Sequence, residues 1–95
     1  MSDHIKNQNE IHRMIRTIMD SMDKPLGRWM VNVIRSAQQQ YVYFVSIDGR
    51  KTSGIFSGKF GVHCKQWEQW TDGEKEFFLQ QKLSDTFDNL EERII

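Results

Sequence analysis

Residues 41–47, with the sequence YVYFVSI, constrain the fold more than any other segment. They are apolar at nearly every position, so both faces of the segment are apolar, as in a strand that is covered on both sides. A strand of this kind is usually central and needs a neighbour along each edge. Asp48-Gly49 follows directly, and this dipeptide is the strongest short signal for a type I′ hairpin. The sequence therefore predicts a central strand that turns there into a second strand over residues 50–57.

A type I′ turn at this dipeptide also fixes the register of the hairpin. The predicted pairs are Ile47 with Arg50, Val45 with Thr52, Val42 with Ile55, and Tyr41 with Phe56. Gly54 would then lie opposite Tyr43 and leave room for its ring. Residues 62–70, which follow this hairpin, match an irregular segment, a short strand or one helical turn.

The other neighbour of the central strand is predicted over residues 28–35. Trp29, Val31 and Val33 alternate there, and these residue types favour strands. Apolar residues at positions 26, 29, 30, 33, 34 and 37 also match helical spacing, and Asp23 with Pro25 would suit a helix start. We favour the strand because it supplies the missing edge, and a helix over residues 25–40 is the alternative.

A helix is predicted at each end of the chain. The first carries one apolar stripe at three- and four-residue steps, made of Ile11, Met14, Ile15, Ile18, Met19 and Met22, and should stop before Pro25. Thr71-Asp72-Gly73-Glu74 matches a capping box and begins the last helix. The stripe of that helix is Leu79, Leu83, Phe87, Leu90 and Ile94, and the adjacent Phe77 and Phe78 exceed what one narrow stripe needs.

These elements predict one small α+β domain over residues 1–95. Its order is α-β-β-β-α, with both amphipathic helices packed on a three-stranded antiparallel meander, or α-α-β-β-α under the alternative. The polar N-terminus predicts no secretion signal, and the longest apolar run is too short to cross a membrane. A single cysteine cannot form an internal disulfide. We therefore expect a cytoplasmic protein.

No catalytic or metal-binding pattern is recognisable. His63-Cys64 is the one adjacent pair of metal-capable residues, and together with His4 and His12 it lacks zinc-type spacing. Adjacent side chains of an extended segment point to opposite faces, so His63 would not activate Cys64 as a nucleophile. The carboxylates of the last helix suit a solvated face, and no glycine-rich phosphate loop is present. We expect no enzymatic activity, no cofactor and no metal.

The net charge of zero conceals an uneven distribution. Residues 24–65 carry seven basic side chains and one acid, or +6, whereas residues 66–95 carry three basic side chains and eight acids, or −5. A sheet face that mixes cations with rings can bind single-stranded nucleic acid. The candidate residues for this are Arg28, Arg35, Arg50, Lys51, Lys59, Tyr41, Tyr43 and Phe56. A pI near 6.8 argues against it, because such domains usually exceed about 9.

Three tryptophans in 95 residues favour contact with another protein. Trp67 and Trp70 lie in a polar segment, where each is either a lid on the core or an anchor for a partner. With Arg50 and Lys51, expected at the hairpin tip, they form the candidate partner-binding set. The two amphipathic helices would also allow a homodimer. The sequence thus predicts a non-catalytic regulator, adaptor or inhibitor that acts through protein–protein contact, with nucleic-acid binding as the alternative.

Overall fold

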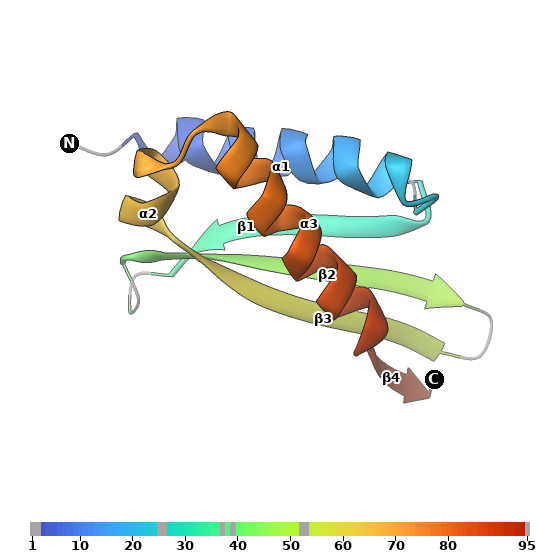
Figure 1. Ribbon diagram of the computed structural model, residues 1–95. Coiled ribbons are helices and arrows are strands. Elements are labelled where there is room, and N and C mark those ends of the chain that lie inside the picture. Colours follow the sequence, from blue (N-terminus) through green and yellow to red (C-terminus); the bar gives the residue numbers. More distant parts are fainter. Residues whose placement is uncertain (1–2, 25–26, 37, 39, 52–53, 95) are drawn as a thin grey trace.

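In the computed structural model, four antiparallel strands form one sheet in the order β1-β2-β3-β4, and the helices lie on one face of it (Figure 1). The structure describes residues 3–24, 27–36, 38, 40–51 and 54–94. The elements are α1 (His4–Ser21), β1 (Trp29–Arg35), β2 (Val42–Lys51), β3 (Gly54–His63), α2 (Cys64–Gln69), α3 (Asp72–Asp88) and β4 (Glu91–Ile94). This order confirms the predicted α-β-β-β-α domain and adds α2 and β4.

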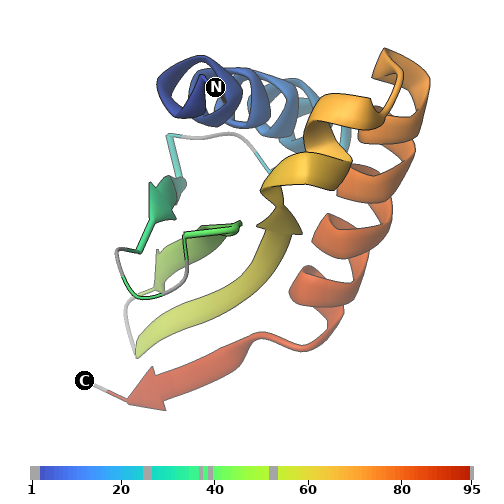
Figure 2. The same ribbon diagram turned by 90° about the vertical axis from the view of Figure 1, so that its left-hand side faces the viewer.

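The strand at residues 28–35 is confirmed over the helical alternative. β1 pairs with β2, so that Val31 faces Ile47 and Val33 faces Val45. All four side chains point to the helix-covered face, where β-branched residues pack well on a pleated surface. Figure 2 shows this face closed by the helices and the opposite face left open. Because only one face is covered, the sheet has a helix side and an open side.

The predicted hairpin register is wrong. β2 continues through Asp48-Gly49 to Lys51, and β3 begins at Gly54, so the predicted turn residues lie within a strand; residues 52–53, between the two strands, are outside the described part. Instead of the predicted pairs, the observed ones are Ile47 with Gly58, Val45 with Phe60, Tyr43 with Val62, Val42 with His63, and Phe56 with Gly49. The predicted partner of Val45, Thr52, also lies outside the described residues.

Gly49 is explained by packing and not by a turn. It lies opposite Trp29, and a Cβ built on Gly49 would lie 2.5 Å from Cε3 of the Trp29 ring. The missing side chain lets the indole lie across β2, in the way that a large ring covers a glycine on a neighbouring strand. β2 and β3 are longer than the predicted strands of the hairpin. Along β2, Tyr43, Val45 and Ile47 all face the helix side, and all three are fully buried.

This contact makes Gly49→Ala a test of the register. The added methyl group would displace the Trp29 ring, and overpacking of this kind costs about 1–3 kcal/mol of unfolding free energy. Gly61→Ala is the matched control within the same sheet, because its Cβ would meet only Val42 Cγ1, at 3.0 Å. Urea denaturation of both variants gives the comparison. Equal stabilities would contradict the packing of Trp29 over Gly49.

The first helix begins and ends where local chemistry dictates. Asp3 caps α1, since its side chain accepts a hydrogen bond from the backbone N–H of Lys6 at 3.0 Å. The helix ends at Ser21. Two residues later, Asp23 has a φ of 60°, in the left-handed region, and Pro25, which is outside the described residues, follows shortly after. The buried part of its stripe is Ile11, Ile15, Ile18 and Met19.

The last helix has the predicted start but an earlier end. Thr71 and Glu74 form the full capping box, with side chain to backbone bonds in both directions. The predicted stripe through Leu90 and Ile94 is wrong at its end, because α3 stops at Asp88. Asn89 donates from its side chain to the carbonyl of Asp85 at 2.8 Å and so satisfies a group that the helix leaves open. The chain then turns into β4, which pairs with β3 from Gly54 to Ser57.

Candidate binding surfaces

Trp67 is a core residue. Its side chain has no exposed area, and it joins α2 to the cluster formed by the helices and the sheet. The Nζ atom of Lys75 lies 4.9 Å from the centroid of one Trp67 ring and 2.5 Å from Oε1 of Glu10. Without exposed surface, this tryptophan cannot contact a partner while the fold stays closed. Of its two sequence-based interpretations, the structure places it as the lid.

The ion pair beside Trp67 perturbs Glu10. Burial alone would raise the pKa of this carboxyl group. The hydrogen bond and charge of Lys75 oppose burial, with smaller contributions from the Trp67 indole and from Arg13, and the net result is a pKa below the ordinary value of 4.5. The side chain of Lys75 therefore lies on the core side of α3, and only 12% of it is exposed.

Trp70 lines an open apolar hollow on the helix side, which we call the Trp70 hollow. Its walls are Trp70, Gly73, Glu74, Phe77, Phe78 and Gln81, and its volume is about 470 Å³. The rings of Trp70 and Phe78 lie 4.9 Å apart between centroids, at an angle of 44°. Phe77 stands beside them with 65% of its surface exposed. In the sequence, Phe77 and Phe78 exceeded what the apolar stripe of this helix needs, and these two residues line the hollow.

The residues predicted to bind nucleic acid do not share one face of the sheet. Tyr43 is fully buried under α1, where its hydroxyl group contacts Nδ1 of His4 at 2.8 Å and accepts from Nδ2 of Asn7 at 3.0 Å. Burial raises the pKa of Tyr43 to about 12. This ring therefore cannot stack on a base. Tyr41 is 63% exposed next to the start of β2, whereas Phe56 is half-buried on the helix side.

The basic residues of that set lie in three places. Arg35 is exposed at the far end of β1, and Lys59 is exposed on the open face of β3. Arg28 and Arg50 come together at the opposite end of β1 and β2, where both line the same two hollows, and Lys51 follows Arg50 at the end of β2. Arg50 and Lys51 end β2, whereas Trp70 is the C-cap of α2, and α2 lies at the other end of the sheet (Figure 1).

We call the two hollows at this end the Trp29 hollows, because Trp29 lines both of them. They share five lining residues: Gly27, Arg28, Trp29, Gly49 and Arg50. Trp29 is fixed between Gly49 and the ring of Phe87, which meets it edge to face with centroids 4.9 Å apart. Lys24 lies over the same two rings, 4.9 Å from Phe87 and 5.8 Å from Trp29. Trp29 was assigned to the sheet from sequence, but nothing there marked it as part of a surface site.

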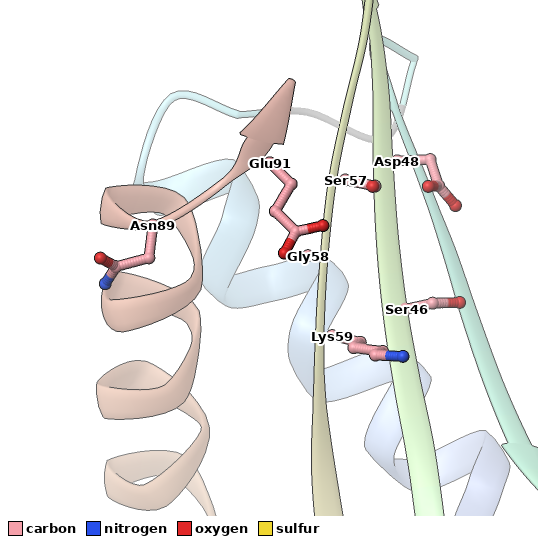
Figure 3. Close-up of a pocket in the computed structure, with 7 residues that line it drawn as sticks. All are labelled: Ser46, Asp48, Ser57, Gly58, Lys59, Asn89 and Glu91. Atoms are coloured by element: carbon pink, nitrogen blue, oxygen red, sulfur yellow. The ribbon is translucent and has the colours of Figure 1, made fainter. Parts of the chain in front are cut away.

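The open face also holds a polar hollow of about 340 Å³ (Figure 3). It is lined by Ser46, Asp48, Ser57, Gly58, Lys59, Asn89 and Glu91. Glu91 points toward β3, while Asn89 points away from the other labelled side chains. No histidine lines this hollow, and no hydrogen bond between its described side chains links a serine to a base.

His63 and Cys64 belong to different elements, since β3 ends at His63 and α2 begins at Cys64. His63 is exposed at the end of β3, whereas Cys64 begins α2 and is buried, with its Sγ atom 3.8 Å from the carbonyl oxygen of Gln40. In the described ranges, no group of three or more histidine, cysteine, aspartate or glutamate residues could hold a metal ion. Nor does any described helix have the length and apolar character needed to cross a membrane.

No family model matches this chain, and neither a curated protein nor a solved structure matches it.

Proposed function

We propose that this protein is a non-catalytic adaptor, regulator or inhibitor that binds a partner protein through the Trp70 hollow. The observation that carries the proposal is Phe77, which is 65% exposed beside the contacting rings of Trp70 and Phe78. Exposed rings of this size, grouped around a hollow, are typical of interface anchors. The free and buried thiol of Cys64 fits a cytoplasmic setting.

Charge indicates the chemistry of the partner. Glu74 lines the hollow, and Asp72 and Glu76 are exposed on the first turns of the same helix. Lys75 is withdrawn into its contact with Glu10 and Trp67, so the three exposed acids face one exposed cation here, Lys82, whose Nζ atom lies 5.7 Å from the centroid of the Phe78 ring. We therefore infer that the partner offers a basic segment, which inserts an apolar side chain between Trp70 and Phe77. Such charge complementarity steers association and selects partners.

Phe77→Ser is expected to abolish partner binding and leave the fold intact. Because the side chain is mostly exposed, its loss should change unfolding free energy by only about 0.5 kcal/mol. Ile5→Ser is the matched control, since Ile5 is a 74% exposed apolar residue on α1. Affinity purification from the host with wild type and both variants gives the comparison. A protein retained by wild type and Ile5→Ser but lost with Phe77→Ser supports the proposal.

A defined probe tests the charge argument separately. A helical lysine-rich peptide with leucines one turn apart should quench the emission of Trp70, and its glutamate-rich counterpart should not. Binding of both peptides alike, or of the lysine peptide to Phe77→Ser with unchanged affinity, would contradict the proposal. A stable self-association lost with Phe77→Ser would identify a second copy of this chain as the occupant instead.

A further inference from the structure

The Trp29 hollows gather cations from three separate places in the chain. Lys24 follows α1, Arg28 precedes β1, and Arg50 lies near the end of β2, yet all three line one surface. In the described part of the chain, neither arginine forms an ion pair with a carboxylate. Both are exposed, so their guanidinium groups are available to an anion, and the planar fork of arginine suits phosphate.

Strand register brings residues of both charges to this end. Ile55 has Arg50 as its partner on β2 and Arg93 as its partner on β4, while Glu92 pairs with Phe56 and Glu91 with Ser57. Two acids, Asp23 and Asp48, also line the hollows. The lining of the two hollows thus carries three cations, Lys24, Arg28 and Arg50, against these two acids.

Apolar surface lies between these charges. Trp29 and Phe56 line the first hollow, of about 610 Å³, while Met30 and Ile55 line the second, of about 590 Å³. Trp29 is held in place by Gly49, Phe87 and Lys24, so its ring is a fixed wall that needs no reordering on binding. A ligand that fits must combine anionic groups with flat apolar groups.

We propose that the Trp29 hollows bind single-stranded nucleic acid, with phosphates on Arg28 and Arg50 and an unstacked base against the Trp29 wall. A base can reach such a wall only when it is released from a duplex. The site lies apart from the Trp70 hollow and does not depend on the proposed protein partner. Of the residues suggested by sequence for nucleic-acid binding, the site includes Arg28, Arg50 and Phe56 and leaves out Tyr41 and Tyr43.

The test is binding of a labelled oligothymidylate of about 12 nucleotides, followed by fluorescence anisotropy at increasing salt. We expect binding at ~50 mM salt that weakens as salt rises. Binding releases cations condensed on the strand, and this release is less favourable when the salt concentration is already high. The double variant Arg28→Ala, Arg50→Ala should flatten the slope of log affinity against log salt by about 1.4, or about 0.7 for each lost phosphate contact. A duplex of the same sequence should bind more weakly.

The double variant Lys6→Ala, Lys65→Ala is the matched control, because it removes the same charge from exposed residues at the opposite end of the molecule. It should leave the slope unchanged. Undetectable binding at ~50 mM salt, or equal losses in both double variants, would overturn the proposal. Equally tight binding of a heparin fragment would overturn it too, since that result describes a general polyanion surface. Phe77→Ser should bind the oligonucleotide normally, which separates this site from the proposed function.

Discussion

Trp67→Ala is expected to lower the free energy of unfolding by about 3–5 kcal/mol, the usual cost of emptying a tryptophan site in a core. The indole has no exposed area, and it lies where α2 meets the cluster of apolar residues on the helix side. Its removal would also take the ring from beneath the Lys75 ammonium group. Urea denaturation followed by circular dichroism measures the loss without relying on tryptophan emission.

Trp70→Ala is the natural comparison, because Trp70 is only partly buried at the margin of the core, where its ring contacts that of Phe78. Its loss should cost clearly less than that of Trp67. Should Trp67→Ala fail to fold, Trp67→Phe keeps a ring at the site and should show a smaller loss in the same direction. Equal and small losses at positions 67 and 70 would mean that Trp67 is not held in the core.

Lys75→Met should destabilise the protein by about 1–3 kcal/mol at pH 7, because it leaves the Glu10 carboxylate without its partner. The loss is smaller than for a fully enclosed pair, since the two side chains keep 12% and 22% of their surface exposed. Adding Glu10→Gln to this variant should restore most of the stability, because no unpaired charge then stays behind.

The effect of Lys75→Met should also depend on pH. The pKa of Glu10 is lowered in the folded protein, so the pair's contribution is fully present above 4.5 and is lost as pH falls through the lower, folded value. Without Lys75, burial would instead raise the pKa of Glu10, and acid would relieve the variant by protonating the carboxylate. The stability gap between wild type and Lys75→Met should therefore narrow at acid pH. A gap independent of pH would contradict the ion pair.

Local patterns were enough to predict α1 and the start of α3, whereas β1 was preferred to a helix because the central strand needed a second neighbour. The apolar stripe, the alternation at Trp29, Val31 and Val33, and the Thr71 capping box each act within a few residues. The hairpin was misplaced because Asp48-Gly49 has a strong local preference, which packing overrides: the glycine serves the Trp29 ring on another strand. The end of α3 was missed for a similar reason, since Leu90 continues the helical spacing but packs over Gly58 of β3.

The candidate surfaces were harder to predict than the fold. Trp67 and Trp70 share one polar segment, and only the path of α2 decides that the first is buried and the second borders a hollow. Tyr43 looked like a stacking ring, but its place under α1 follows from the alternation of β2. Arg28 was chosen as a cation beside the predicted first strand and Arg50 as one at the hairpin tip, and their proximity depends on a register between β1 and β2 that was not predicted.

Helix α3 has different neighbours at its two ends. Phe77, near its start, borders the Trp70 hollow, whereas Phe87, ten residues later and about 15 Å along the axis, holds Trp29. Two ligands could thus occupy the two sites together, since neither would stand in the other's place. The helix would then act as a rigid spacer, and the protein could bridge two molecules at a fixed separation.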